Sequence, residues 1–323
     1  MTPTGAQPLR VGFLGPLGTF CEQALLTQPD LAAAELVPIP TIAEVLRAAD
    51  AGEVDAGFIP VENSIEGTVN LTVDALAFTH ELLIQREVVL DVELCLMALP
   101  GTSLGEVREV VSFPHALAQC HGFFRDELPG VRTVAATSTA EAARLVGEER
   151  RVGAAAVSPA LAAKLYGLEV IATHIEDHDL NQTRFLLVTK EGVPEPTGHD
   201  KTSIVVYQRA NVPGSLLSIL QEFAARAINL LRVESRPTKR GGLGDYCFMI
   251  DLEGHLADEV VADSLRELHM KQGGVKFLGS YPAGGQHAPV RRQAADRAWQ
   301  EANSWVAELR SRVGRSPLPP PPA

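Results

Sequence analysis

Short apolar runs alternate with amphipathic stretches over roughly the first 190 residues. The runs are rich in Val, Ile and Ala and end in Gly or polar residues, which predicts buried strands. They are Val11–Leu14, Val54–Val61, Val110–Phe113, Val131–Ala135, Val152–Val157 and Arg184–Thr189. A longer β-rich stretch, Leu82–Leu99, predicts either two strands or one bent strand that crosses the domain.

Two capping-box signatures mark helix starts between these strands. Thr41 with Glu44 predicts a helix over Thr41–Ala49, and Ser138 with Glu141 predicts one that continues to Val146. Strands that alternate with helices in this way predict an α/β domain with mostly parallel sheets.

A second pattern follows residue 201, with the element order β-α-β-β-α-β. The expected elements are Thr202–Gln208, Pro213–Ala227, Asn229–Arg236, Tyr246–Leu252, Asp258–Met270 and Val275–Ser280. A Gly-rich turn at Gly241–Gly244 joins the middle strands. This order predicts a ferredoxin-like module of split βαβ units.

Two breaks in composition separate these regions. Glu191–Lys201 is rich in Pro, Gly and charge and predicts a linker, and a second break lies at Pro282–Pro289. Beyond it, Ala295–Val313 carries a heptad-like apolar stripe, which favours either a helix docked on its own chain or a contact with another chain. Pro317–Ala323 is nearly all proline, and we expect it to be disordered or polyproline II.

The overall charge narrows the class of partner. A formal net charge of −12 and a pI of about 5.2 argue against nucleic acid or an anionic membrane as a partner, although a local pocket can still be positive.

The four cysteines form no CxxC pair, which suits a reducing cytosol and predicts neither zinc nor a disulfide framework. The start of the chain is short and polar, unlike a signal peptide. No apolar run approaches the roughly 20 residues of a membrane span, so we expect a cytoplasmic protein.

The first motif with candidate chemistry is Gly15-Pro16-Leu17-Gly18-Thr19-Phe20, between a strand and a helix. Its glycines allow a tight turn, and backbone N–H groups at a helix start bind anions. Thr19 adds a hydroxyl donor. The glycine spacing is not GxGxxG, so a dinucleotide site is disfavoured. A simple strand–helix turn is the alternative.

The second motif is Pro60-Val61-Glu62-Asn63-Ser64-Ile65-Glu66-Gly67, which follows a buried strand and places Glu62–Ser64 at the carboxyl end of that strand. Ligands bind at the carboxyl ends of strands in open α/β sheets, and three successive polar residues there are hard to explain by packing. The alternative is an Asn/Ser turn with a helix cap.

The third motif is Asn181-Gln182-Thr183-Arg184-Phe185, directly before a strand. Arg184 has the bidentate fork that holds carboxylates, and Thr183 has a hydroxyl that a desolvated site could use as a donor. A solvated arginine at a strand start is the alternative.

Other reactive side chains favour structural interpretations. The loop with His174, Glu176, Asp177, His178 and Asp179 lacks metal-ligand spacing and is interpreted as a solvated acidic loop. His115 and His121 are expected on helix surfaces. Cys21 lies near a helix N-terminus but has no His beside it, so a buried structural role is favoured.

Taken together, the three motifs resemble prephenate dehydratase, whose patterns are GPxGTF, (I/V)P(V/I)ENSxEG and NxTRF in this order. Ser138-Thr139-Ala140 and Tyr166-Gly167-Leu168 agree with it, and Pro213–Leu216 with Glu234–Pro237 resemble the GAL and ESRP motifs of its ACT domain. The resemblance spans roughly residues 9–282. Each motif is weak alone, and the ordered set is specific.

The resemblance implies conversion of prephenate to phenylpyruvate, water and CO₂, without a cofactor or metal, under allosteric control by phenylalanine. Implied catalytic residues are Thr183, Arg184, Glu62, Asn63 and Ser64; implied substrate contacts are Thr19, Phe20, Ser138, Thr139, Asn181 and Phe185. Implied effector contacts are Asn211, Pro213, Gly214, Ser215, Leu216, Glu234, Ser235, Arg236 and Pro237. Arogenate dehydratase and a non-catalytic amino-acid sensor are the alternatives, and a homodimer or homotetramer is expected.

The implied fold is a two-lobed catalytic domain, like a periplasmic binding protein, over residues 9–190. One lobe takes 9–85 and 183–190, and the other takes 86–179. An ACT domain over 201–282 and a helical tail over 283–323 follow. Three departures from the family pattern are Cys21 for Ser, Phe113-Pro114-His115 for HPQ, and Ser215 for the Ala of the GAL motif.

Overall fold

A computed structural model describes residues 8–178, 180–238, 245–284 and 292–313. They form two compact units that divide between Gly192 and Val193. The predicted turn at Gly241–Gly244, Asp179 and the proline-rich end lie outside the described residues.

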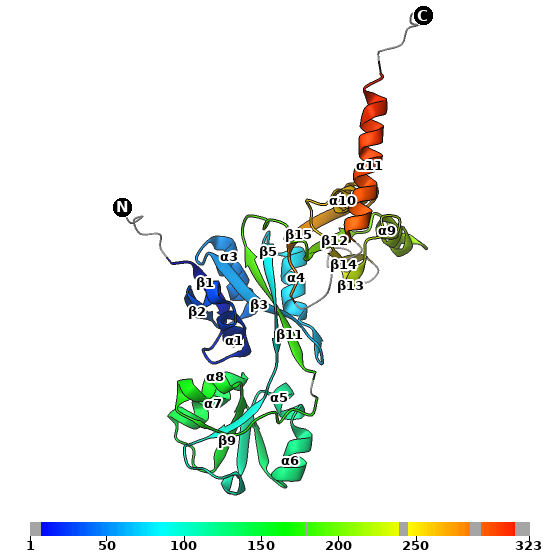
Figure 1. The fold of residues 1–323 in the computed structure, drawn as a ribbon. Coiled ribbons are helices and arrows are strands. Elements are labelled where there is room, and N and C mark those ends of the chain that lie inside the picture. The colour runs from blue at the N-terminus through cyan, green and yellow to red at the C-terminus, as the bar shows by residue number, and fades with distance from the viewer. Residues whose placement is uncertain (1–7, 179, 239–244, 285–291, 314–323) are drawn as a thin grey trace, which may run out of the picture. The chain divides into compact units, whose positions relative to one another are not determined.

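The first sheet of the first unit has the strand order β2-β1-β3-β11-β5, with β4 paired to β3 (Figure 1). These strands are β1 (Arg10–Leu14), β2 (Glu35–Ile39), β3 (Ala56–Asn63), β4 (Gly67–Thr68), β5 (Leu83–Asp91) and β11 (Gln182–Thr189). The helices in this part of the chain are α1 (Phe20–Leu26), α2 (Pro29–Ala32), α3 (Ile42–Ala51) and α4 (Asn70–Phe78). We call this part the first lobe.

The second sheet has the order β10-β6-β9-β7-β8 and forms the second lobe with its helices. Its strands are β6 (Cys95–Ala98), β7 (Glu109–Ser112), β8 (Arg132–Ala135), β9 (Ala154–Ser158) and β10 (Glu169–Ala172). Its helices are α5 (Pro114–Ala118), α6 (His121–Glu127), α7 (Thr139–Glu148), α8 (Ala160–Tyr166) and the short 3₁₀ turn η1 (Leu104–Glu106). The chain crosses between the lobes twice, after β5 and before β11.

The alternation of strands and helices predicted mostly parallel sheets. The sheets are instead mixed, because the chain crosses between the lobes and returns. The pairs β1–β2, β1–β3, β7–β8 and β7–β9 are parallel. Antiparallel pairing enters through β11 with β3 and β5, and through β6 with β9 and β10. The stretch Leu82–Leu99 forms two strands, the first of the two alternatives. Because β5 stays in the first sheet to Asp91, the expected lobe boundary at residue 85 falls inside this strand.

Helix starts follow the predicted capping signatures. The Thr41 hydroxyl accepts the backbone N–H of Glu44 at the start of α3, and the Ser138 hydroxyl accepts that of Glu141 at the start of α7. Each bond satisfies an N–H group that the first turn of a helix leaves without an intrahelical partner.

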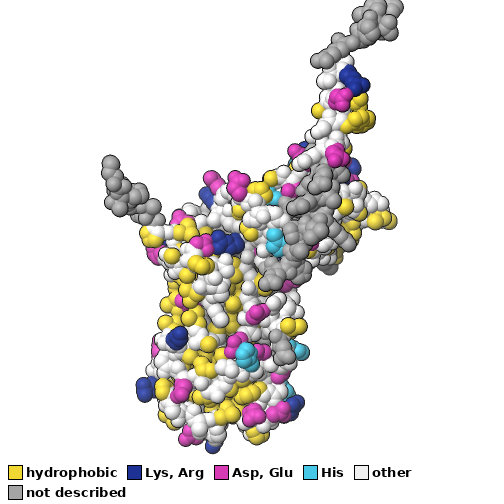
Figure 2. Space-filling model, in the orientation of Figure 1, with side chains coloured by type: hydrophobic (Ala, Val, Ile, Leu, Met, Phe, Trp, Pro, Cys, Tyr) yellow, Lys and Arg dark blue, Asp and Glu magenta, His cyan; other side chains and the backbone are white. Residues whose placement is uncertain are grey.

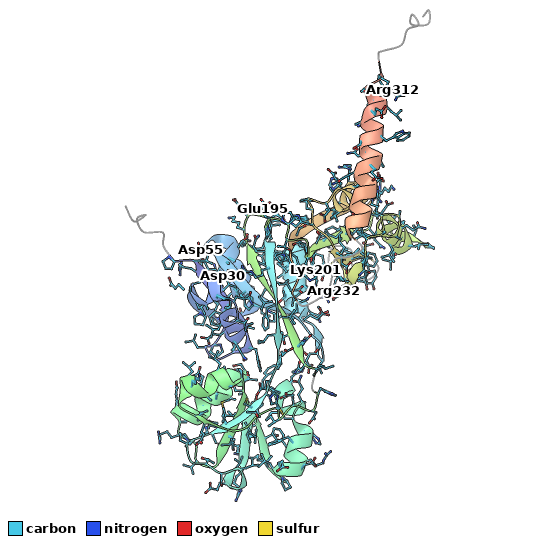
Figure 3. All side chains as sticks on the ribbon, viewed as in Figure 1. Asp30, Asp55, Glu195, Lys201, Arg232 and Arg312 are labelled. Carbon is cyan, nitrogen blue, oxygen red and sulfur yellow. The ribbon has the colours of Figure 1, made fainter. Side chains whose placement is uncertain are left out.

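Each lobe has its own hydrophobic core. In the first lobe Phe58 on β3 stacks on Phe185 on β11 with ring centroids 5.3 Å apart. Asp30, labelled in Figure 3, makes a bidentate ion pair with Arg86 and so ties α2 to β5. Phe20 packs against the core of the first lobe and against that of the second, which places its ring where the lobes meet.

The second unit contains the predicted β-α-β-β-α-β order. Its sheet has the strand order β13-β14-β12-β15. The elements are β12 (Asp200–Tyr207), α9 (Ser215–Ala224), β13 (Leu230–Pro237), β14 (Tyr246–Glu253), α10 (Glu259–Lys271) and β15 (Gly274–Pro282). Buried residues of both helices, among them Phe223 and Leu268, pack with Ile204 and Ile250 of the central strands, so both helices cover one face of the sheet.

The tail forms the helix α11 (Arg292–Arg310). Trp305 is 61% exposed, and Leu309 and Val313 near the end of the helix are exposed as well. Figure 2 shows hydrophobic side chains at the surface of this helix. The described part of the chain holds no helix with the length and hydropathy needed to cross a membrane.

Candidate active site

The second and third motifs meet where β3 ends and β11 begins. Asn63 and Thr183 face each other in the register of these antiparallel strands. The Asn63 amide nitrogen Nδ2 donates to the Thr183 hydroxyl oxygen over 3.0 Å. Motifs about 120 residues apart in the sequence are therefore joined by one side-chain bond.

The orientation of the Asn63 amide is determined by its partners. Its Oδ1 accepts the backbone N–H groups of Ile65 and Glu66, each at 2.9 Å, and only an oxygen can accept them. The NH₂ group must then face Thr183. A hydroxyl has one proton, and since Thr183 accepts from Asn63, that proton remains to be donated to another group.

Two more amides continue this network. Asn63 Nδ2 also donates to Asn181 Oδ1 at 2.8 Å, and Asn181 Nδ2 donates to Gln119 Oε1 at 3.0 Å. Gln119 Nε2 donates to Glu66 Oε1 at 3.1 Å. Asn181 is only 3% exposed. Since Gln119 caps α5 in the second lobe, the network joins both lobes.

Gln119 and Glu66 were not among the site residues that the sequence predicted. Gln119 has no local signal, because it ends an unremarkable helix and meets the site only through the packing of the lobes. Glu66 lies within the second motif, in the turn between β3 and β4, and its carboxylate also bonds His115 Nδ1 at 2.6 Å. His115, expected as an ordinary surface residue, stacks on Phe113 with ring centroids 5.4 Å apart.

Arg184 lies on the other face of the sheet from Thr183, because side chains alternate along a strand. Its guanidinium pairs with Glu62 at 3.3 Å and with Glu87 at 3.1 Å. The side chain of Glu87 is 1% exposed and that of Arg184 is 13% exposed. The charge of Arg184, which the sequence predicted to bind a substrate carboxylate, is thus compensated by two carboxylates of the protein itself.

Two further residues of these motifs have structural contacts. The Ser64 hydroxyl accepts the backbone N–H of Gln182 at 2.9 Å and donates to the Leu180 carbonyl at 3.1 Å, which fastens the end of β3 to the start of β11. Phe185 is 1% exposed and lies in the core of the first lobe.

The first motif forms a tight turn before α1. Gly18 has a φ of +85°, and a Cβ there would lie 3.3 Å from the Ala162 backbone of the second lobe. The Thr19 hydroxyl accepts the Glu22 N–H as the helix N-cap, and the Gly18 N–H donates to the Glu22 carboxylate. The turn also accepts the Tyr166 hydroxyl at the Leu17 carbonyl, 2.9 Å away, so it contacts both lobes.

The half-buried residues Ser138 and Thr139 begin α7 in the second lobe, with the Ser138 hydroxyl occupied as the N-cap. They are not members of the amide network.

Some of the other reactive side chains that the sequence singled out are buried or bonded to the backbone. Cys21 is 5% exposed, and burial raises the pKa of its thiol well above its usual range. In the acidic loop, Glu176 accepts the Leu94 N–H and Asp177 accepts the Gly122 N–H, so both carboxylates order neighbouring backbone. No cluster of three or more potential metal ligands occurs among the described residues.

In the second unit, a pocket of about 430 Å³ opens beside α9. Of the predicted effector contacts it is lined by Asn211, Gly214, Ser215 and Leu216, together with Phe248 and other residues. Gly214 has a φ of +89°, a left-handed conformation that favours glycine. Glu234–Pro237 lies on the neighbouring strand β13, where Ser235 pairs with Phe248.

Comparisons with known proteins match this division of the chain. The prephenate dehydratase family model matches residues 11–193, and the ACT domain model matches residues 202–269. Prephenate dehydratase from Amycolatopsis methanolica is 43% identical over 303 residues, which cover 93% of this chain and 97% of that protein.

Solved structures agree. That of prephenate dehydratase from Arthrobacter aurescens in complex with L-Phe has a TM-score of 0.84 and 40% identity, covering 94% of this chain and 100% of that one. GqqA, described as a novel type of quorum quenching acylase, has a TM-score of 0.75 and 30% identity, covering 87% of this chain and 99% of that one. The motifs that these matches span contain the Asn63–Thr183 pair, and the chain belongs to the prephenate dehydratase family.

Proposed function

We propose that this protein converts prephenate to phenylpyruvate, water and CO₂ in phenylalanine biosynthesis, and that phenylalanine controls it through the ACT domain. Family membership over nearly the whole chain supports the reaction. The observation that carries the proposal is the Asn63–Thr183 hydrogen bond, because it leaves the Thr183 proton to be donated to a substrate oxygen.

In this reaction the electron pair of the bond to the lost carboxylate moves into the ring, and hydroxide leaves from the opposite carbon. Aromatisation supplies the driving force, so the protein needs to orient the substrate and stabilise the departing oxygen. We propose that the Thr183 hydroxyl is the hydrogen-bond donor that stabilises this oxygen. The departing hydroxide becomes water by taking up a proton through Thr183, which regains one from solvent, and the electron balance requires no oxidant or reductant.

The other motif residues have supporting roles in this proposal. Asn63 and Asn181 orient the donor, and Ser64 fixes the strand ends that carry it. Arg184 and Glu62 act as a structural ion pair on the opposite face. Phe185 supports the strand from the core. The remaining candidate substrate contacts lie at helix starts of the two lobes: they are Thr19, Phe20, Ser138 and Thr139.

The effector site we propose is the pocket beside α9. Its apolar lining, with Leu216, Leu220 and Phe248, fits an aromatic side chain, and the polar residues Asn211 and Ser215 also line it. The Arthrobacter aurescens relative was solved in complex with L-Phe, which supports the same ligand for this chain.

We further propose a homodimer or homotetramer in the cytoplasm. Exposed apolar residues around the pocket and on β13 support self-association: they are Val212, Leu217, Leu231 and Val233. All four cysteines are free and buried, which suits a reducing compartment.

One assay tests the proposed function. Purified protein is given prephenate or arogenate, each with and without phenylalanine, and product formation is measured. We expect the highest kcat/KM with prephenate and a change in rate with phenylalanine. Faster turnover of arogenate would replace the proposed substrate, and phenylalanine binding without any turnover would favour a sensor.

A further inference from the structure

Glu66 occupies both ends of the amide network. Its backbone N–H donates to Asn63 Oδ1, and its carboxylate Oε1 accepts the Gln119 amide. Between these ends, Asn63 donates to Asn181, and Asn181 donates to Gln119. The bonds form a closed ring that starts and finishes on one residue, and we call it the amide ring.

The direction of every bond in the amide ring follows from Glu66. A carboxylate only accepts, so Gln119 must present its NH₂ group to Glu66 and its oxygen to Asn181. A backbone N–H only donates, so Asn63 must present its oxygen to Glu66 and its NH₂ group to Asn181 and Thr183. Each amide could otherwise rotate by 180° at little steric cost, and the two ends of Glu66 select one orientation.

We propose that Glu66 is a positioning residue for the dehydration, acting through Gln119, Asn181 and Asn63 to orient the Thr183 hydroxyl toward the departing oxygen. This inference rests on the proposed function. Because Gln119 comes from the second lobe and the other members do not, Glu66 also couples the orientation of the donor to the contact between lobes.

The second carboxylate oxygen of Glu66 makes a bond that holds the Glu66 side chain in place. Oε2 lies 2.6 Å from His115 Nδ1, and this nitrogen must carry a proton because the carboxylate only accepts. The Phe113 ring stacks on His115 and holds the imidazole plane. The Phe113-Pro114-His115 sequence, which departs from the family pattern, thus has a defined contact in this chain.

Substitutions of Glu66 test the inference against a purely structural role. Glu66→Ala removes the acceptor for Gln119, and we expect kcat for prephenate to fall at least about 10-fold, with KM changed less than about 3-fold. Glu66→Gln keeps an oxygen that can accept from Gln119, so we expect kcat within about 3-fold of wild type. His115→Ala leaves the Gln119 bond, and its loss should be smaller than that of Glu66→Ala.

Matched controls separate positioning from folding. Glu53→Ala removes another exposed, ion-paired glutamate of the first lobe, and we expect no change in kcat. Glu66→Ala combined with Gln119→Ala should be no slower than Gln119→Ala alone, because the Glu66 effect passes through Gln119. Additive losses, or a lowered melting temperature with normal kcat below it, would overturn the inference.

The side-chain amide of Gln119 gives a readout that does not depend on activity. In ¹⁵N-labelled protein its two protons, assigned by their absence in Gln119→Ala, should be shifted from free-amide positions in wild type and Glu66→Gln. In Glu66→Ala they should move toward those positions. A wild-type protein inactive on prephenate rejects the proposed function, whereas unchanged Gln119 signals in Glu66→Ala reject the role of Glu66.

Discussion

Thr183 and Arg184 are neighbours on β11, yet they bond on opposite faces of the sheet. Thr183 accepts from Asn63 on one face, and Arg184 pairs with Glu62 and Glu87 on the other. Two successive residues of one motif therefore have separate jobs in our proposal. Thr183 belongs to the chemistry, and Arg184 belongs to the scaffold that sets the strand in place.

Replacing Thr183 tests the first of these roles. We expect Thr183→Ala to lower kcat for prephenate by at least roughly 10²-fold, the scale of losing one oriented donor. Thr183→Ser keeps the hydroxyl and should retain most of the rate. Steady-state phenylpyruvate formation measures both variants, and an unaltered kcat in Thr183→Ala would remove Thr183 from the reaction.

Asn63→Asp tests the direction of the bond to Thr183. The two side chains have nearly the same shape, but an ionised Asp cannot donate, so the Thr183 hydroxyl would turn its proton toward residue 63. We expect kcat to fall about 100-fold while the fold is preserved. The comparison is between kinetics and the melting temperature. A large loss of stability with little loss of kcat would show that Asn63 only orders its turn.

Arg184→Met tests the scaffold role. The change removes a cation from beside the buried carboxylate of Glu87, and breaking a buried pair from one side costs about 3–5 kcal/mol. We expect unfolding by urea at a lower midpoint. Arg184→Met with Glu87→Met should recover part of the loss, because both charges are gone. If the single variant instead keeps wild-type stability and loses substrate affinity, Arg184 binds a substrate carboxylate after all.

The dependence of stability on pH offers a test in the ACT domain. The pKa of Glu222 on α9 is lowered chiefly by its hydrogen bond with Lys271 on α10, with help from Arg226. A carboxyl whose pKa is lower in the folded state stabilises above its unfolded pKa, and this contribution is lost as the pH falls through the folded value. Lys271→Met should therefore reduce stability at neutral pH more than at low pH. Equal losses at both, measured by urea unfolding, would mean that Lys271 acts through packing.

Local patterns in the sequence predicted much of the fold. The capping signatures of Thr41 and Ser138 identified two helix starts, and short apolar runs identified most strands, because each signal lies within a few residues. The strand β2, Glu35–Ile39, was missed because it is short, contains Pro38 and is only partly buried at the edge of its sheet.

The site was predicted less completely, for a geometric reason. The motifs indicated Asn63 and Thr183, but the face on which Arg184 lies depends on strand register, and its partner Glu87 comes from a strand that carries no motif. Gln119 reaches the site from the other lobe. Such relationships arise only when strands pair and lobes pack, so no local pattern contains them.

Ser215→Ala tests the departure from the family pattern in the ACT domain. The Ser215 hydroxyl accepts the Val212 N–H at 3.1 Å and lies 2.8 Å from the Ala210 carbonyl, so it orders the loop that lines the proposed phenylalanine pocket. Losing about 1 kcal/mol of this order predicts phenylalanine binding weakened about 5-fold, with kcat unchanged in its absence. Ser218→Ala, one turn along α9, removes a hydroxyl that bonds the Ser215 carbonyl, and it should leave the affinity near wild type. Calorimetric titration with phenylalanine decides: equal affinities in all three proteins would show that the pocket does not depend on this loop.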